Sequence, residues 1–384
     1  MGKKWVTAFA AAPREARMGT EGVVGRTVRL ETVINLTGDT VRLRFGNLFG
    51  ETPVRIGPIV LWNGRSNAEI TFDGISSLKL APGHTIQSDE VYLPIRAGDQ
   101  ISVLIYFPAG EPAPHSASGV WQVAYSQPGD FTQQPDFIPD LSVTGKEQVP
   151  VGQPLPTLMD IEILSDENAH AIACFGDSIT EMRLWTDPLE AHVRETMPET
   201  ALLNLGIGGN RLLLPTGGKF SEMGGELFGL SGLKRMQWDL LEKSGIDTVI
   251  LALGVNDVSQ PGSGEFCPPV AERCTLETFA AGVSRVVLTL KKAGIRVIGC
   301  TITPFGGMPG CCEETLEIRR EINSWLIRRT AAGELDGLID FASAVADPQD
   351  TDQLLAEYDS GDHLHPSKLG GEQMAAAVAS ANLL

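Results

Sequence analysis

From residue 171 onward, short apolar segments alternate with longer stretches of helical character, and this alternation restricts the fold more than any other feature of the sequence. Two of the longer stretches, residues 275–294 and 314–333, have the length and composition of helices. Strands that alternate with helices form a parallel sheet covered on both faces. We therefore predict an α/β domain over residues 166–384. Its expected strands are residues 171–175, 201–205, 247–253, 295–301 and 336–341.

The sequence before this domain has a different pattern, in which short segments alternate apolar and polar side chains. In TVRLRF, residues 40–45, the alternation makes one face apolar and the other polar. Similar segments follow at short intervals, separated by Gly, Pro, Asn and Asp and without helical stretches between them. This spacing favours a β-sandwich or jelly-roll-like domain, which we assign to residues 1–165. Pro58 and Pro94 lie within two of the segments and predict sheet edges or bulges there.

Charge and hydropathy exclude several classes of partner. The formal net charge is −18 and the pI is about 4.8, which argues against binding to nucleic acid or to anionic membrane surfaces. There is no apolar run long enough for a membrane span. The apolar stretch near the N-terminus is interrupted by Pro13, Arg14 and Glu15, so it makes a poor signal peptide. We therefore expect a cytoplasmic location.

The six cysteines do not form a disulfide scaffold or a zinc motif, because no two of them have C-x-x-C spacing. Cys174 and Cys300 lie in apolar strand-like segments and are expected to be buried as small hydrophobic side chains. The sequence leaves open whether disulfides join Cys267 to Cys274 or the adjacent Cys311 and Cys312. A metal or redox role for these thiols is not expected.

Chemistry is expected in the loops that leave the strand ends, because ligands bind at the carboxyl ends of strands in parallel sheets. Three strands run directly into segments rich in glycine and polar residues, and a fourth such segment precedes the last helix. These segments are GDSIT at 176–180, GIGGN at 206–210, GVND at 254–257 and DHLHP at 362–366.

The first segment allows two interpretations of Ser178. The serine follows a strand and enters a helix, so it suits an N-cap that accepts hydrogen bonds from free helix N–H groups. At the same position it would suit a nucleophile whose own amide helps to hold an oxyanion. The G-x-S-x-G motif of many hydrolases is absent around Ser178.

Two further segments offer hydrogen-bond donors. The glycines at 206–209 resemble part of a dinucleotide motif, but Arg211 stands where its third glycine would fall, so this cofactor is not expected. Gly209 instead suits a tight turn or an N–H group that approaches a substrate oxygen. Asn256 and Asp257 suit a simple strand-to-helix turn, or an asparagine amide directed at an oxyanion.

The segment DHLHP raises the choice between a metal site, acid/base catalysis and helix capping. Asp362, His363 and His365 make an awkward metal site, and the other histidines are scattered, so no further ligand is evident. Asp362 and His365 are three residues apart and can lie on one side of a turn. The carboxylate can then accept from Nδ1–H, and Nε2 remains free to take a proton from a hydroxyl. His363 is expected to point elsewhere, and Pro366 suits the first turn of the last helix.

Together these four segments resemble those of the SGNH (GDSL) hydrolases, whose serine, glycine, asparagine and histidine lie in separate blocks. The corresponding residues here are Ser178, Gly209, Asn256 and His365, with Asp362 beside the histidine. The resemblance covers about residues 171–384, and it implies a flavodoxin-like three-layer domain with a five-stranded parallel sheet. It further implies a serine esterase without metal or cofactor. TITPFGG, residues 301–307, is similar to a bacterial two-domain subgroup with a β-rich N-terminal domain, which includes carbohydrate acetyl esterases.

The expected function is therefore hydrolysis of short-chain esters, acetyl first among them, with a small molecule or a carbohydrate as the esterified group. Ser178, His365 and Asp362 would form the triad, and the oxyanion would be held by Ser178, Gly209 and Asn256. The alternatives are an acyltransferase that uses the same triad and a non-catalytic carbohydrate-binding protein. The N-terminal domain is expected to bind a polysaccharide, to shape the rim of the active site or to mediate homo-oligomer formation.

Overall fold

The computed structural model describes residues 2–15, 20–120, 123–144, 153–216, 228–265 and 267–384. The chain divides into two compact units. Unit 1 consists of Met1–Ala171, Met197–Leu203 and Lys243–Gly245, and unit 2 consists of Ile172–Thr196, Asn204–Glu242 and Ile246–Leu384.

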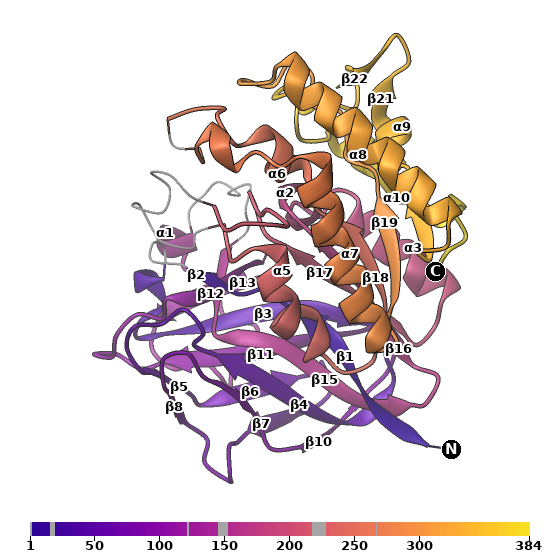
Figure 1. Ribbon diagram of the computed structural model, residues 1–384. Coiled ribbons are helices and arrows are strands. Elements are labelled where there is room, and N and C mark those ends of the chain that lie inside the picture. The colour runs from indigo at the N-terminus through magenta and orange to yellow at the C-terminus, as the bar shows by residue number, and fades with distance from the viewer. Residues whose placement is uncertain (1, 16–19, 121–122, 145–152, 217–227, 266) are drawn as a thin grey trace. The chain divides into compact units, whose positions relative to one another are not determined.

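Unit 1 is built around two five-stranded sheets (Figure 1). In β4 the predicted alternation is confirmed, because Val41, Leu43 and Phe45 are fully buried while the residues between them are partly exposed. The rings of Phe45 and Phe72 pack edge to face with centroids 5.7 Å apart, which places both in one apolar core. The first sheet contains β1 (Lys3–Ala10), β15 (Leu158–Asp166), β4 (Gly38–Gly46), β10 (Val91–Ile95) and β9 (Thr85–Gln87). The second contains β13 (Val123–Pro128), β3 (Arg26–Ile34), β11 (Asp99–Phe107), β6 (Ile59–Trp62) and β7 (Asn67–Ile70).

Smaller elements complete unit 1, and the expectation of a β-rich N-terminal region is confirmed. A three-stranded sheet and a two-stranded ribbon accompany the large sheets, with the short helix α1 (Leu141–Thr144). The three-stranded sheet contains β14 (Gln153–Pro156), β12 (Ser116–Val120) and β2 (Arg14–Glu15), and the ribbon pairs β5 (Val54–Ile56) with β8 (Leu78–Leu80).

The two prolines within predicted strands behave differently. Pro94 lies in β10, an edge strand whose pairing with β4 shifts register between Tyr92 and Ile95, as predicted. The prediction for Pro58 was wrong, because this residue lies between β5 and β6 and not within a strand. Gly57 has a φ of 110°, a conformation that favours glycine, so the backbone turns here and one predicted strand becomes two.

The predicted five-stranded parallel sheet is confirmed, and most of its residues belong to unit 2. The first strand of this sheet in the chain lies second in space, so the order is that of a doubly wound flavodoxin-like sheet. In spatial order the strands are β17 (Thr200–Gly206), β16 (His170–Gly176), β18 (Ile246–Ala252), β19 (Arg296–Cys300) and β20 (Gly337–Ile339).

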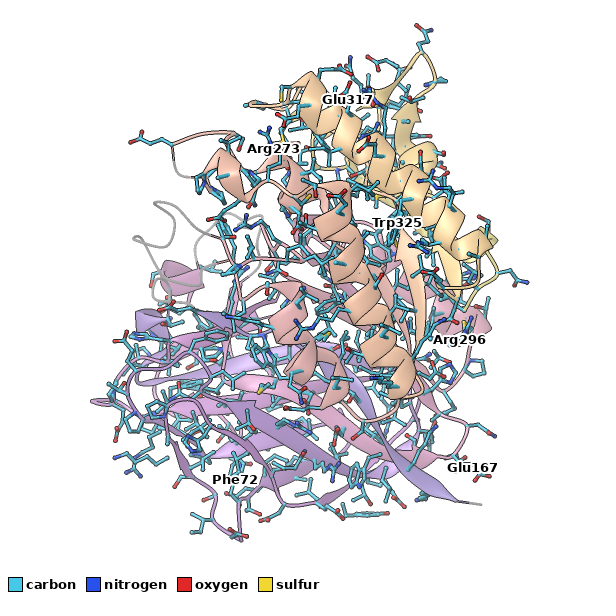
Figure 2. All side chains as sticks on the ribbon, in the orientation of Figure 1. Phe72, Glu167, Arg273, Arg296, Glu317 and Trp325 are labelled. Atoms are coloured by element: carbon cyan, nitrogen blue, oxygen red, sulfur yellow. The ribbon has the colours of Figure 1, made fainter. Side chains whose placement is uncertain are left out.

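Two groups of helices accompany this sheet. The helices α7 (Leu276–Lys292) and α8 (Glu313–Ala331) pack side by side, and α10 (Lys368–Ser380) packs against α3 (Thr186–Thr196) and α9 (Phe341–Val345) (Figure 1). α7 begins at a capping box in which Thr275 and Thr278 bond each other's backbone, and it buries one apolar face. On α8, Trp325 is buried and Glu317 is exposed (Figure 2). The other short elements are α2 (Ser178–Glu181), α5 (Gly232–Met236), η2 (Gln237–Leu241), α6 (Val255–Ser259), η3 (Val270–Glu272), β21 (Ala346–Asp347) and β22 (Asp350–Leu354).

All six cysteines are free, which answers the question of pairing that the sequence left open. Cys174 and Cys300 are buried as predicted, and burial raises the pKa of both thiols. Burial raises the pKa of Cys274 to about 12, so this thiol is protonated at neutral pH. Among the described helices, none combines the length and apolarity required to cross a lipid bilayer.

Candidate active site

Ser178 stands at a sharp junction between β16 and α2. Asp177 is the N-cap of α2, and its Oδ1 accepts a hydrogen bond from the backbone N of Ile179 at 3.1 Å. Capping is therefore done by the aspartate, and the serine hydroxyl is available for another partner. A side chain at Gly176 would place Cβ 2.0 Å from Thr180 Oγ1, so the turn requires glycine there.

The partner of Ser178 is His365, as the sequence predicted. His365 Nε2 lies 2.8 Å from Ser178 Oγ, and His365 Nδ1 lies 2.6 Å from Asp362 Oδ2. Asp362 Oδ1 accepts from the backbone N of Leu364 at 3.0 Å and of His365 at 2.8 Å. The structure thus joins serine, imidazole and carboxylate in one line of hydrogen bonds across 187 residues of sequence.

The charge of Asp362 is stabilised by this arrangement. Partial burial raises its pKa, but the hydrogen bonds from the His365 ring and from two backbone N–H groups outweigh burial and lower the pKa to about 2. The carboxylate is therefore ionised throughout the neutral range. An ionised carboxylate against Nδ1 favours the tautomer in which Nδ1 carries the proton and Nε2 faces the serine.

His363 points away from this line and forms a separate pair. Its Nδ1 lies 2.7 Å from Asp359 Oδ2, and its backbone N donates to Asp359 Oδ1 at 3.0 Å. Its φ of 64° turns the chain so that the two imidazoles diverge, and its ring lies beside Gly307. The partner Asp359 was not foreseen, although its four-residue spacing to His363 was visible in the sequence.

The prediction for Pro366 was wrong by two positions. The helix α10 begins at Lys368. Its N-cap is Ser367, whose Oγ accepts from the backbone N of Gly370 at 3.2 Å. Pro366 precedes this cap and forms a β-bridge with Asp359, which closes the turn that carries both histidines.

Gly209 lies in the loop after β17, and Asn256 lies in α6, the short helix that follows β18. Gly209 has a φ of 68°, and a Cβ there would lie 2.8 Å from the ring of Phe228. Asn256 is 3% exposed, and its Nδ2 donates to the backbone O of Asn210 at 3.1 Å. Within the described part of the chain, no acceptor is recorded for the backbone N–H of Ser178 or of Gly209. Amides without an internal acceptor are suited to hold an oxyanion.

Two carboxyl groups near these residues are buried, that of Asp257 in α6 and that of Asp177 at the N-cap of α2. Asp257 accepts from the backbone N of Leu212 at 2.7 Å and of Leu213 at 2.9 Å, which fastens the chain beyond Gly209 to α6. Burial raises the pKa of Asp257 to about 6 despite these bonds. Burial raises the pKa of Asp177 to about 7, with a further contribution from the negative charge of Asp257.

The fully buried Arg235 joins the end of β16 to the end of β17 and to the loop that follows β17. It donates to the backbone O of Gly176 at 2.7 Å and of Leu205 at 2.9 Å, and to Asn210 Oδ1 at 2.9 Å. Its charge is paired with Asp239, 2.7 Å away. Buried guanidinium groups are stable only with such complete pairing, so this residue fixes the geometry of the loops. Arg235 was not predicted, because it lies in a helix outside the four motifs in the sequence.

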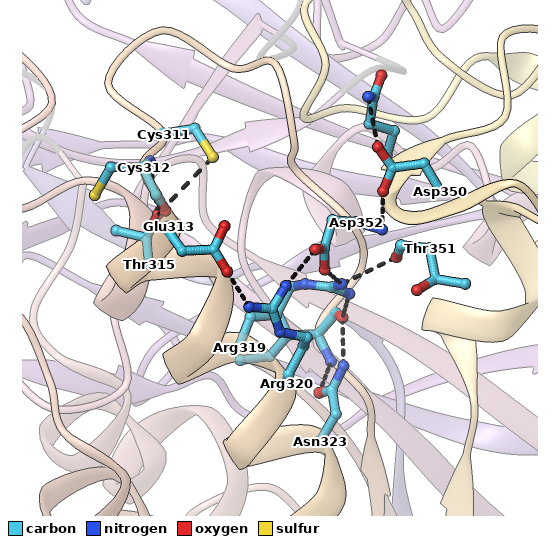
Figure 3. Close-up of polar contacts among 12 residues, drawn as sticks. Cys311, Cys312, Glu313, Thr315, Arg319, Arg320, Asn323, Asp350, Thr351 and Asp352 are labelled. Carbon is cyan, nitrogen blue, oxygen red and sulfur yellow. Dashed lines mark hydrogen bonds and ion pairs between the residues drawn. The ribbon is translucent and has the colours of Figure 1, made fainter.

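A second network fixes the segment that follows β19 (Figure 3). Asn323 exchanges two hydrogen bonds with the backbone of Ile302, at 2.7 and 2.9 Å. Arg319 donates to Asp352 Oδ1 at 2.5 Å, and the backbone O of Asp352 accepts from the N of Gly306 at 2.7 Å. The residues 302–307 are thereby held by side chains of α8 and by β22.

Among the described residues, no group of three or more His, Cys, Asp or Glu side chains is placed to hold a metal ion. The pair of Asp362 and His365 is engaged with Ser178 and with backbone N–H groups. The chemistry available to these groups is therefore proton transfer and nucleophilic attack by a hydroxyl.

Comparison with known proteins identified one family and a number of similar solved structures. Residues 174–372, more than half of the chain, match the GDSL-like Lipase/Acylhydrolase family. No curated protein matched the sequence. Similar solved structures include a lipolytic protein of the G-D-S-L family from Desulfitobacterium hafniense, with 19% identity, a TM-score of 0.39, and coverage of 56% of this chain and 99% of that one.

Two other solved structures have comparable similarity. A GDSL-like lipase from Bacteroides thetaiotaomicron is 16% identical with a TM-score of 0.39, covering 55% of this chain and 86% of that one. An acetyl xylan esterase, AlAXEase, is 22% identical with a TM-score of 0.37, covering 55% of this chain and 99% of that one. By the match over residues 174–372, which contain all four motifs, the chain belongs to the GDSL-like lipase/acylhydrolase family of hydrolases.

Proposed function

We propose that this protein hydrolyses short-chain carboxylic esters, with acetyl as the preferred acyl group, through a Ser178–His365–Asp362 triad and an acyl-enzyme. The observation that carries the proposal is the pair of distances at His365, 2.8 Å from Nε2 to Ser178 Oγ and 2.6 Å from Nδ1 to Asp362 Oδ2. Both distances are within hydrogen-bond range. His365 can therefore take a proton from Ser178 while Asp362 orients the imidazole ring.

In the first half of the proposed reaction, Ser178 Oγ attacks the ester carbonyl carbon while its proton passes to His365 Nε2. The carbonyl oxygen becomes an oxyanion, which the backbone N–H groups of Ser178 and Gly209 and the amide of Asn256 would hold. When the intermediate collapses, the bond to the alcohol oxygen breaks and His365 gives its proton to that oxygen. The alcohol leaves, and the acyl group remains on Ser178.

In the second half, His365 takes a proton from water as the water oxygen attacks the acyl-enzyme. Collapse of this second intermediate returns the proton to Ser178 Oγ and releases the carboxylic acid. Asp362 stays ionised throughout, because its pKa of about 2 is far below that of an imidazolium. Its part is to orient the ring and to stabilise the positive charge that His365 carries in each intermediate.

The first experiment is hydrolysis of p-nitrophenyl acetate by the wild type and by Ser178→Ala, followed by aryl esters of increasing acyl length. The proposal expects turnover that depends on Ser178 and declines as the acyl chain lengthens. Acetylated xylan and acetylated monosaccharides then test a carbohydrate as the esterified group. Absence of Ser178-dependent turnover on all these esters would leave the alternative of a non-catalytic carbohydrate-binding protein.

The choice between the two histidines can be tested directly. His365→Ala is expected to abolish most of kcat, whereas His363→Ala is expected to retain it, because His363 bonds Asp359 and not Ser178. Equal losses in both variants would contradict the assignment. An acyltransferase would instead require an acceptor alcohol or thiol and release the acylated acceptor without free acid, which product analysis distinguishes.

A further inference from the structure

Gln260, the residue that follows α6, contacts two parts of the proposed oxyanion hole with one amide group. Its Nε2 donates to the side-chain Oδ1 of Asn256 at 3.0 Å and to the backbone O of Gly209 at 3.0 Å. A primary amide nitrogen carries two hydrogens, so both bonds can exist together. None of the four motifs includes this position, which lies four residues after Asn256 at the C-cap of α6.

These contacts determine which way both amides face. The backbone O of Gly209 faces the end of the Gln260 side chain, so the Gln260 nitrogen, and not its oxygen, must lie there. Asn256 must then present its oxygen to Gln260, and its Nδ2 faces the opposite way. Of the two Nδ2 hydrogens, one is used by the backbone O of Asn210 at 3.1 Å. One donor remains for a ligand.

The same side chain constrains Gly209. Its backbone O accepts from Gln260 Nε2 at 3.0 Å and from Thr216 Oγ1 at 3.4 Å. Because Gly209 has a φ of 68° and lacks a side chain, its backbone would otherwise rotate easily. A fixed carbonyl restricts ψ at this residue, and thereby the path by which the chain leaves the turn.

Gln260 carries out this role at a cost in hydrogen bonding. Its Oε1 is buried and has no recorded partner among the described residues. A buried acceptor without a partner destabilises a protein, because its hydrogen bonds to water are lost and not replaced. Such groups are uncommon and call for an explanation. Here the explanation is that Nε2 of the same amide is needed to bond Asn256 and Gly209.

We propose that Gln260 is a positioning residue for ester hydrolysis, which orients the Asn256 amide and the Gly209 backbone so that both donate to the oxyanion. This inference rests on the proposed function. Gln260 does not itself act on the reacting atoms. Since the oxyanion exists only in the intermediate and its transition states, loss of Gln260 should reduce kcat and leave KM nearly unchanged.

The principal test compares Gln260→Met with Gln237→Met in the full-length protein, using p-nitrophenyl acetate. Gln237 is an exposed glutamine of unit 2 whose amide bonds Glu242, so its replacement controls for the change of side chain. Removal of a direct oxyanion donor costs about 10²–10³ in kcat, and we expect about 10- to 100-fold from loss of a positioning residue. The control should keep the wild-type kcat, and both variants should keep the wild-type far-UV circular dichroism.

Gln260→Glu separates orientation from packing. Glutamate has nearly the shape of glutamine, so a purely structural role predicts that it is tolerated better than methionine. An ionised carboxylate, however, only accepts hydrogen bonds. It would repel the O of Gly209 and favour rotation of the Asn256 amide, which would turn Oδ1 toward the oxyanion. The proposal therefore expects a larger loss of kcat in Gln260→Glu than in Gln260→Met.

A double-mutant cycle supplies the decisive result. In an Asn256→Ala background, Gln260→Met should reduce kcat much less than in the wild type, because one of its two targets is gone. Additive effects, or a Gln260→Met variant that behaves like Gln237→Met, would overturn the inference while leaving the esterase proposal intact. Absence of Ser178-dependent hydrolysis by the wild type would overturn both.

Discussion

Asp362 performs two tasks with its two carboxylate oxygens. Oδ2 faces the imidazole of His365, while Oδ1 accepts from two backbone N–H groups of the turn. The turn and the ring are therefore oriented by one charge. A conservative substitution can therefore separate the proposed catalytic role of this residue from its structural role.

Asp362→Asn should reduce kcat by about 10³–10⁴-fold while the fold is retained, by analogy with the aspartate of other triads. Asparagine keeps Oδ1 for the backbone, but places an NH₂ group against Nδ1. This favours the tautomer with the proton on Nε2, which cannot accept from Ser178. The measurements are kcat and the melting temperature. Asp359→Asn makes the same change in the neighbouring pair with His363, and similar losses in both variants would contradict the prediction.

Asp177 should make stability depend on pH in the neutral range. Burial raises its pKa from 3.8 to about 7, so the folded protein holds this proton more tightly than the unfolded chain. The resulting stabilisation is complete below pH 3.8 and is lost as pH rises through 7. Asp257 adds a loss of the same sign as pH rises through about 6.

Asp177→Asn should therefore flatten this dependence, because asparagine mimics the protonated carboxyl and retains Oδ1 to cap α2. We expect the variant to equal or exceed the wild type in unfolding free energy at about pH 8, and to lose less stability between about pH 4 and about pH 7. Urea unfolding across this range provides the measurement. Parallel curves for the two proteins would show that Asp177 does not titrate there.

The candidate site residues that lie in compact motifs could be predicted from the sequence. The spacing of Asp362 and His365 correctly indicated their hydrogen bond. Gln260 and Arg235 could not be found in this way, because the contacts that give them their roles include loops distant in sequence. A glutamine or an arginine in a helix has no local signature of such contacts.

At the scale of elements, two strand-to-helix junctions approach each other too closely for side chains. A Cβ at Gly206 would lie 2.2 Å from the backbone N of Glu181 and 2.8 Å from the backbone O of Asp177. Both neighbours are backbone atoms, which cannot move without displacing the start of α2. The end of β17 and the turn that carries Ser178 are therefore in direct contact.

Gly206→Ala is consequently expected to destabilise the protein by about 1–3 kcal/mol or more, as overpacking does, and to reduce kcat by displacing Ser178. Gly264→Ala is the matched control, because a Cβ at Gly264 meets no atom within 4 Å and its φ is not positive. Melting temperature and kcat on p-nitrophenyl acetate are the readouts. A Gly206→Ala variant as stable and active as the control would contradict this close approach.

In unit 1, the strand β15 contains a charge that is completely buried. Asp160 bonds the Nζ of Lys243 at 2.8 Å, both side chains are fully buried, and Arg44 lies 3.6 Å from the same carboxylate. Burial raises the pKa of Asp160, and the two cations oppose that effect. Buried ion pairs of this kind stabilise a protein little in themselves, but one charge left alone is costly.

Lys243→Met should therefore destabilise the protein by about 3–5 kcal/mol, whereas Lys243→Met combined with Asp160→Leu should recover much of that loss. Urea unfolding measures both variants. If the double variant is as unstable as the single one, the residues would contribute through packing and not through charge.

Elements were predicted where local periodicity was strong. The strands and long helices of unit 2 lie where the apolar segments indicated, and the alternation of β4 is as expected. The segment around Pro58 was read as one strand because its apolar run continues through the break. The positive φ of Gly57, and not hydropathy, divides it.

At the scale of the whole molecule, the net charge of −18 opposes compaction through self-repulsion. We expect the melting temperature at about pH 8 to rise when salt increases from about 10 mM to about 0.15 M, since the Debye length falls from about 30 Å to about 8 Å. The effect should be much smaller near the pI of about 4.8. A melting temperature that falls with salt at the higher pH would show that attractive charge pairs dominate.

The fold class was predictable at this scale, but the sheet partners in unit 1 were not. Alternating strands and helices indicated the parallel sheet, because right-handed crossovers leave few ways to order it. In unit 1, β1 pairs with β15 and β10 pairs with β4. Such pairings between distant antiparallel strands depend on packing, and the local pattern of each strand does not specify its neighbour.

The 187 residues that separate Ser178 from His365 have a consequence for synthesis of the protein. A growing chain acquires its serine with the first strand-to-helix junction of unit 2, but its imidazole only after all five strands of the parallel sheet have been made. Nascent chains are therefore expected to remain inert toward the cell's esters until the turn at residues 358–367 emerges from the ribosome. The measurement is labelling of ribosome-arrested chains of graded length with a serine-directed fluorophosphonate. Labelling of Ser178 is expected only in chains long enough to expose residues 358–367.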